Sequence, residues 1–282
     1  MHTETLRAPR LGVARAAAPR RVVAMNAYHY RRGGADTVFL ESNALLEASG
    51  WEVAPFTMHH PDNLPSRWSS HFAEEVELGR DYSPLEKVQR AARIVYSLDA
   101  RAKLAGLLDA FQPAVVHAHN VYHHLSPSVL GLVHGRGLPV VLTLHDFKLL
   151  CPAYQMLSAE GVCERCKGGK VHNVVMHRCV KGSATLSALV YVESAVHRLL
   201  RTYERCVDRF IAPSRFLLEK CVEWGWPRER FVHVPNFVDA ERFAMPGAAG
   251  RVVLYAGRLA PEKGLETLVR AAALSTVPVW LG

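Results

Sequence analysis

Short apolar runs alternate with longer segments of helical periodicity along this chain, and this alternation restricts its fold more than any other feature. Runs of this kind are typical of buried strands, and they occur at Arg21–Met25, Trp51–Phe56, Ala114–His119, Pro139–Leu144, Phe210–Ser214 and Phe231–Val234. The intervening segments include helices expected over residues 84–111, begun by a capping box at Ser83 and Glu86, and over residues 185–207. Strands that alternate with helices pair in parallel, so the sequence predicts an α/β sheet of Rossmann type.

One further combination of strand, turn and helix lies near the end of the chain. Val252–Tyr255 form an apolar run, Gly257 suits the turn, and Pro261 suits the first position of a helix. Arg258 and Lys263 would then lie near the helix N-terminus, where two cations and free N–H groups suit a diphosphate. An ordinary βα unit with solvated Arg and Lys side chains explains the same residues.

The sequence GRLAPEKG over residues 257–264 closely resembles the opening of the donor-binding domain in GT-B glycosyltransferases of family 4. The resemblance extends from about Val22 to the end of the chain. It implies two Rossmann-like domains that face each other across a cleft, with Arg258 and Lys263 bound to the diphosphate of a nucleotide-sugar. It also implies sugar transfer with retention of anomeric configuration and no metal ion in catalysis.

The resemblance leads to an expected domain organisation. The family's pair of glutamates, eight residues apart, and its returning helix would come later than Gly282, so we expect a chain truncated inside its donor domain and impaired in transfer. The expected parts are a disordered tail (1–20), a complete Rossmann-like N-terminal domain on the acceptor side (21–240) with a cysteine-rich insertion (147–182), a linker (241–250) and the first β-α-β piece of the donor-binding domain (251–282).

Three histidines follow strands at the edge where an open α/β sheet binds ligands. His117 and His119 lie at the carboxyl end of their strand and, two residues apart, point to one face. They either line the acceptor side of a site, or one is a hydrogen-bonded core histidine and the other lines a loop. His145 and Asp146 follow the next strand, where the family carries an HD or HE pair, and the resemblance implies that His145 faces the sugar or acceptor. Asp146 either orients the imidazole of His145 or caps the following loop.

Gly33 and Gly34 lie where the first strand passes into a helix. Turns need glycine in any case, so this pair indicates little by itself. The resemblance implies that the glycine-rich loop touches donor phosphate or acceptor.

The most distinctive segment carries four cysteines in the pattern C-x11-C-x2-C-x12-C, at Cys151, Cys163, Cys166 and Cys179. The C-x2-C spacing lets two thiolates share a metal ion, and the flanking pair would complete a tetrahedron that closes a polar loop. A redox pair or four unrelated buried thiols are the alternatives. A subset of family 4 is similar here, with HD followed by Cys-Pro and a cysteine-rich loop. We expect a structural zinc that has no open position and takes no part in catalysis.

Composition sets wider limits on partners and location. The net charge of +8 fits a phosphate-bearing substrate or an anionic membrane surface. No apolar stretch reaches the roughly 20 residues that span a bilayer. Six cysteines without a secretory signal favour a reducing compartment. We expect a cytoplasmic protein, either free or peripheral at the inner face of the membrane, with no nucleic-acid partner.

The function implied by the resemblance is that of a retaining glycosyltransferase. It would move a sugar from a nucleotide-sugar donor to a glycan or lipid-linked acceptor in cell-envelope or exopolysaccharide synthesis. Two other functions stay open, namely a non-catalytic acceptor-binding module and another GT-B enzyme such as a sugar-nucleotide epimerase.

Overall fold

The computed structural model describes residues 20–76, 83–243, 251–260 and 263–282. These parts of the chain form two compact units. The first contains the described residues up to Ser158 and Val162–Asn236, and the second contains Ala159–Gly161 and the described residues from Phe237 onward. Most of the tail and linker predicted from the sequence lies outside the described residues, as do Pro261 and Glu262. The domain limits predicted at residues 240 and 251 therefore stay predictions.

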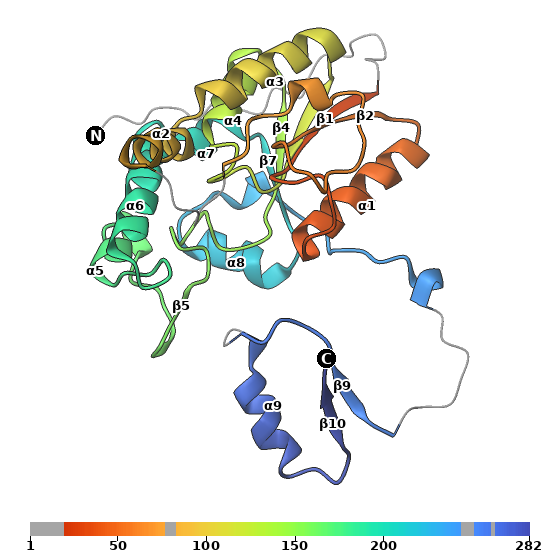
Figure 1. Cartoon of the computed structure of the whole chain (residues 1–282), viewed down its shortest axis with the longest axis vertical. Helices are drawn as coiled ribbons and strands as arrows, with labels where there is room; N and C mark the ends of the chain where they lie inside the picture. The colour runs from red at the N-terminus through yellow and green to blue at the C-terminus, as the bar shows by residue number, and fades with distance from the viewer. Residues whose placement is uncertain (1–19, 77–82, 244–250, 261–262) are drawn as a thin grey trace. The chain divides into compact units, whose positions relative to one another are not determined.

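The first unit is built on a parallel sheet whose six described strands have the order β2-β1-β3-β4-β7-β8 (Figure 1). The register places Val23 of β1 between Ala54 of β2 and Val116 of β3. Each strand matches one of the predicted apolar runs, so the predicted α/β fold is confirmed. The strands are β1 (Arg21–Met25), β2 (Glu52–Phe56), β3 (Val115–Ala118), β4 (Val140–Thr143), β7 (Arg209–Ala212) and β8 (Phe231–His233).

Helices cover both faces of this sheet. Figure 1 shows α1 on one side and α3 and α4 on the other. Right-handed crossovers require this, because the chain steps from β1 outward to β2 and then back across the sheet to β3 and β4. In the described part of the chain, no helix has both the length and the apolarity that crossing a bilayer requires. The helices are α1 (Gly34–Ala48), α2 (Pro84–Val95), α3 (Leu98–Phe111), α4 (Ser128–Gly135), α5 (Asn173–Met176), α6 (Ala184–Leu199), α7 (Thr202–Cys206) and α8 (Arg215–Glu223).

Two helices that we predicted as continuous are each broken in the structure. The capping box begins α2 as expected, because Ser83 and Glu86 each hydrogen-bond the backbone N–H of the other. The helix over 84–111 ends early, since Ser97 Oγ accepts a hydrogen bond from Ala100 N at 3.1 Å and so caps a new helix, α3. The helix over 185–207 breaks at Arg201, whose φ of 51° is left-handed.

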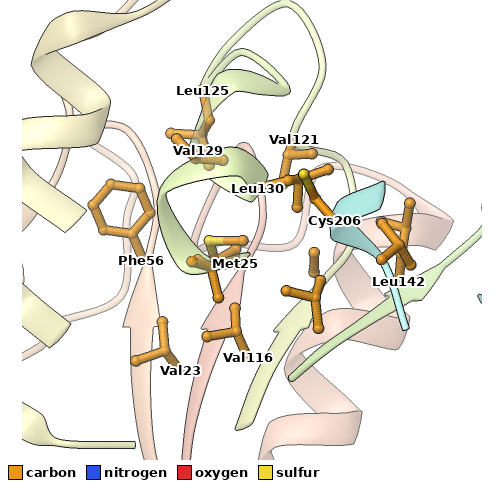
Figure 2. Packing of buried hydrophobic residues seen from close by; sticks show 14 of the residues in the cluster. Val23, Met25, Phe56, Val116, Val121, Leu125, Val129, Leu130, Leu142 and Cys206 are labelled. Carbon is orange, nitrogen blue, oxygen red and sulfur yellow. The ribbon is translucent and has the colours of Figure 1, made fainter. Parts of the chain in front are cut away.

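The core of the first unit lies between the sheet and the helices that follow its strands. Figure 2 shows Val23, Met25 and Val116 of the sheet packed towards Leu130 of α4. The buried Cys206 and Cys221 belong to the same cluster, so both are packing residues. We did not predict α4 from the sequence, although its apolar side chains close one face of the sheet.

The second unit is a small β-α-β piece. It comprises β9 (Val253–Tyr255), α9 (Leu265–Ala272) and β10 (Val279–Leu281), and the two strands pair in parallel. The helix begins later than predicted, because Gly264 adopts a left-handed φ of 69° just before Leu265. None of its described residues belongs to the buried hydrophobic core of the protein. A piece of this size buries too little surface to form a core by itself.

The strand order of the larger sheet determines where a ligand can bind. The chain runs from β1 outward to β2 and then returns to β3 on the other side of β1. Loops that leave β1 and β3 therefore run in opposite directions, and in open α/β sheets ligands bind at the carboxyl ends of such strands. The predicted glycines and histidines of the first unit lie at or after the ends of β1, β3 and β4.

Candidate functional site

The carboxyl edge of the sheet is held together by the side chain of Asn26, which directly follows β1. Asn26 Nδ2 donates to Asp36 Oδ1 of α1 at 2.8 Å, and Asn26 Oδ1 accepts from Asn120 N at 3.3 Å. Both Asn26 and Asp36 are buried. The first loop, α1 and the end of β3 are thus joined at one point. Neither residue was singled out from the sequence, although an Asn directly after a buried apolar run is an available signal.

The three predicted histidines lie together at this edge. His119 Nδ1 and His145 Nε2 are 2.8 Å apart, and their rings stack with centroids 5.1 Å apart. The ring centroid of His117 lies 4.3 Å from that of His119, and His117 Nε2 is 2.8 Å from Thr143 Oγ1 of β4. Adjacent parallel strands bring these side chains together, because β3 and β4 end at the same edge.

The burial and contacts of His119 determine which ring nitrogens of His119 and His145 carry a proton. His119 is 1% exposed and packs against the ring of Phe39, with centroids 5.3 Å apart. Its Nε2 atom has no hydrogen-bond partner among the described residues. Orphaned buried N–H groups are rarer than orphaned acceptors, so we assign the proton of His119 to Nδ1, which donates to His145 Nε2. Neutral His145 then carries its own proton on Nδ1.

All three imidazoles are neutral near pH 7. Burial lowers the pKa of His117 to about 4. Burial, and then the neighbouring His117, lower the pKa of His145 to about 4. Burial lowers the pKa of His119 well below its ordinary value, with His117 and His145 adding to the effect. A neutral imidazole N–H donates a hydrogen bond without adding charge, which suits a sugar hydroxyl.

These pKa values predict that the protein loses stability in mild acid. An unfolded histidine binds its proton near pH 6.5 and these folded ones near pH 4, so between these values the unfolded state binds more protons. The free energy of unfolding should therefore fall as the pH is lowered from about 6.5 to about 4. Urea unfolding at pH 7 and pH 5 measures the difference. This change in unfolding free energy between pH 7 and pH 5 should be smaller in His117→Asn than in the natural protein. It should stay the same in His134→Asn, which alters an exposed histidine. An equal change in both variants would show that the buried histidines are not its cause.

Asp146 caps the loop that follows His145. Asp146 Oδ1 accepts from Lys148 N at 2.9 Å, and Asp146 Oδ2 accepts from the hydroxyl of Tyr122. Neither bond involves His145, so the structure favours the loop-capping alternative over orientation of the imidazole. Burial raises the pKa of Asp146, and its hydrogen bond with Tyr122 opposes that effect. We did not predict Tyr122 as its partner.

A buried ion pair lies behind this loop, and the sequence analysis missed it. Lys148 Nζ lies 2.8 Å from Glu193 Oε2 of α6, and the two side chains are 7% and 1% exposed. His123 Nδ1 lies 3.2 Å from the same carboxylate oxygen. Burial alone would raise the pKa of Glu193, but Lys148 and His123 outweigh it and lower the pKa to about 2. The apolar periodicity of α6 gave no signal that a buried glutamate faces this loop.

The space inside the cluster is too small for a substrate. A cavity of about 10 Å³ is lined by His119, His145 and Tyr203, among others. This volume holds about one water molecule. A ligand larger than a water molecule therefore does not fit inside the cluster.

Gly33 and Gly34 lie beside this edge, at the N-terminus of α1. Gly33 is the residue before the helix and is extended, with φ −164°, which any residue adopts. A Cβ atom at Gly34 would meet nothing within 4 Å. The chain therefore does not need glycine here for its own packing, and the absent side chains leave room for a ligand. Their predicted contact with donor or acceptor stays a prediction.

Arg258 and Lys263 belong to the second unit, in the loop between β9 and α9. Both side chains are exposed. Tyr255 Oη donates to the backbone oxygen of Arg258 at 2.8 Å, and a Cβ atom at Gly257 would lie only 3.0 Å from Tyr255 Oη. The turn predicted at Gly257 is therefore tight for a packing reason. The diphosphate role of the two cations stays a prediction.

The four cysteines of the insertion line one cavity of about 20 Å³. Burial raises the pKa of Cys166 to about 12, and the thiols of the other three add to this rise. The four thiols therefore share one cavity, and whether they form a metal site, a redox pair or unrelated buried thiols stays a prediction. All six cysteines in the described part of the chain are free. Among these described residues, no group of three or more His, Cys, Asp or Glu side chains already has the arrangement of a metal site.

Comparisons with known proteins agree with the fold. Solved structures with similar folds include sucrose-phosphate synthase from Thermosynechococcus elongatus, with 16% identity and a TM-score of 0.52 over 93% of this chain and 61% of that one. Anabaena HepE in complex with UDP and glucose has 14% identity and a TM-score of 0.48, over 93% of this chain and 59% of that one. The catalytic domain of Arabidopsis thaliana starch synthase IV, bound to ADP and acarbose, has 13% identity and a TM-score of 0.48, over 94% and 68%.

The likeness to sucrose-phosphate synthase, at 16% identity, supports a shared fold and nothing about function. The present chain spans 61% of the length of that synthase. A comparison with curated proteins finds no match. The profile described as Glycosyltransferase Family 4 matches residues 32–242, which is more than half of the chain. This chain therefore belongs to glycosyltransferase family 4 and has the GT-B type of fold.

Proposed function

We propose that this protein transfers a sugar from a nucleotide-sugar donor to a glycan or lipid-linked acceptor, with retention of anomeric configuration. The observation that carries this proposal is the pair formed by His119 and His145 at the carboxyl edge of the sheet, in a chain of family 4. Cell-envelope or exopolysaccharide synthesis on the cytoplasmic side of the membrane would supply such acceptors.

The residues of the first unit would hold the reacting sugar and the acceptor. His145 donates a hydrogen bond from Nδ1 to a sugar hydroxyl, while His119 behind it keeps the imidazole in that tautomer. His117 supports the same edge from β3. Asp146 shapes the loop through the hydroxyl of Tyr122 and acts as a positioning residue. The backbone at Gly33 and Gly34 offers N–H groups at the start of α1 to a donor oxygen.

The second unit would bind the leaving group. Arg258 and Lys263 neutralise charge as it develops on the departing diphosphate. Two fixed cations can supply the charge that a divalent metal ion supplies in other transferases, so we propose that no metal takes part in the transfer itself.

Peripheral contact with a membrane is supported by the junction of α6 and α7. Leu199 is 85% exposed there, and Leu200 beside it is exposed too. Arg198 and Arg201 flank these leucines in the sequence. Exposed apolar side chains next to cations suit the interface of an anionic bilayer.

Release of nucleoside diphosphate from nucleotide-sugars tests the proposal. The natural gene product is incubated with UDP- and ADP-sugars, with candidate acceptors and with or without added Mg²⁺. We expect nucleotide release that depends on an acceptor and not on Mg²⁺, and a product with the donor's anomeric configuration. Acceptor binding without nucleotide release would instead support a binding module, and release of free nucleotide-sugar isomers an epimerase.

His145→Ala should lower kcat/KM for transfer about tenfold, because it removes one neutral hydrogen bond to the sugar. The fold should persist, since His145 lies at the edge of the sheet rather than inside the main core. Steady-state kinetics of transfer measure the effect, with His134→Ala as an exposed control. Unchanged kcat/KM in the His145 variant would remove this residue from the site.

A further inference from the structure

The cysteine-rich insertion has little packing of its own. Its regular elements are two strands of two residues each, β5 (Leu157–Ser158) and β6 (Gly161–Val162), a short 3-10 helix at Lys167–Gly169, and the single turn of α5. The small apolar cluster beneath it contains only Ala153, Val174 and Val190 as buried members among the described residues. Such a segment lacks the buried apolar surface that ordinarily offsets the entropy of ordering the chain.

The four cysteines nevertheless approach one cavity from separate parts of the insertion. Cys151 follows a turn in which its backbone N donates to Phe147 O at 2.8 Å. Cys163 directly precedes, and Cys166 lies within, a turn closed by a hydrogen bond from Lys167 N to Glu164 O at 3.0 Å. Cys179 comes after α5, where its backbone N donates to Val174 O at 3.0 Å. The backbone alone thus delivers four thiols to the same space.

We propose that this cavity binds one structural zinc ion through four thiolates, those of Cys151, Cys163, Cys166 and Cys179. Zinc prefers tetrahedral sulfur ligands, and the volume of about 20 Å³ suits a single ion. Each thiol transfers its proton to water as its Zn–S bond forms, so binding releases four protons and leaves a site of charge −2. The insertion offsets this charge with cations that include Arg165, Lys167 and Lys170.

The tetrahedron would be completed by movement of the cysteine side chains. The described side chains are not yet arranged as a metal site. Rotation about χ1 moves a sulfur atom while the backbone stays in place, and the sparse packing of the insertion permits it. His177 also lines the cavity and is a spare ligand, but four thiolates close the coordination sphere without it.

The zinc would brace the loop that carries the candidate sugar site. Cys151 lies five residues after Asp146, and Lys148 Nζ donates to Pro152 O at 3.2 Å, directly next to the first ligand. An ion that fixes Cys151 therefore restricts the segment that holds Asp146 and Lys148. The zinc has no open position and would not contact the substrate.

Metal content tests the site independently of any activity. The natural protein, purified without oxygen after growth with zinc, should contain one zinc per chain. X-ray absorption at the zinc edge of this unmodified protein should show four sulfur neighbours at about 2.3 Å. Cys163→Ser and Cys166→Ser should each lose most of the zinc. Cys221→Ala, which removes a buried thiol from α8, should keep it and serves as the matched control.

Three results would overturn the proposal. They are zinc well below one per chain in the unmodified protein, nitrogen or oxygen neighbours in place of the four sulfurs, and equal zinc in Cys163→Ser and the control. Bound iron in place of zinc would contradict the identity of the ion. Because the absorption measurement uses unmodified protein, it decides the question even if the serine variants fail to fold.

Discussion

Arg258→Ala is expected to lower kcat/KM for sugar transfer by about 100-fold to 1,000-fold, the usual cost of removing one preorganised group that stabilises developing charge. The side chain is exposed in the loop between β9 and α9. Its removal should change the free energy of unfolding by less than about 0.5 kcal/mol. Transfer kinetics, equilibrium binding of UDP and ADP, and urea unfolding together separate a binding role from a folding role. Lys263→Ala should show the same pattern.

Two further variants sharpen this result. Arg258→Lys keeps the charge but loses the planar pair of donors, so it should recover only part of the lost activity if the guanidinium binds phosphate bidentately. Arg270→Ala is the matched control, because Arg270 is an exposed cation of α9 that pairs with Glu266 in the helix. Equal losses in Arg258→Ala and Arg270→Ala would show a general effect of charge, and full activity in Arg258→Ala would refute the phosphate assignment.

Glu193→Gln is expected to destabilise the protein by about 3–5 kcal/mol, because it leaves Lys148 charged and buried without its anion. A loss of this size is a large fraction of the stability of an ordinary domain. Urea unfolding at neutral pH measures the change. The loop at Asp146 should loosen as well, so amide hydrogen exchange at Lys148 should accelerate in the variant.

The origin of this loss is tested by removing both charges together. Glu193→Leu combined with Lys148→Met should restore most of the stability, since buried ion pairs are often replaceable by apolar side chains of similar volume. Glu219→Gln is the surface control, because Glu219 and its partner Arg228 are both exposed, and it should cost less than about 1 kcal/mol. If Glu193→Gln costs no more than the control, the buried pair has no special role.

Local patterns in the sequence predicted those features that depend on residues close together in the chain. Each strand of the sheet follows from its own apolar run, and the start of α2 follows from Ser83 and Glu86, three positions apart. The same patterns missed the interruptions at Ser97 and Arg201. Helical periodicity continues across both positions, and only the competing cap and the left-handed backbone end the helix there.

The sequence also identified the histidines and cysteines as candidates but not their partners. His119 and His145 are 26 residues apart and meet because β3 and β4 pair in the register that sets Ala118 beside Leu142. Tyr122 reaches Asp146 for the same reason. The four cysteines line one cavity, and their convergence on a single metal ion stays a prediction.

The sequences around Lys148 and Glu193 did not predict that these two residues form an ion pair. Lysine and glutamate are ordinarily solvated, and Glu193 occupies a helix whose apolar stripe alone was visible in the sequence. Its burial depends on where α6 packs, and its charge persists there because Lys148 and His123 arrive from distant loops.

The sequence by itself determined the strands, their parallel pairing and the candidate chemistry, because these follow from short-range periodicity. Only the tertiary structure decided which charges are buried and which side chains meet, because desolvation and pairing depend on contacts between residues far apart in the chain.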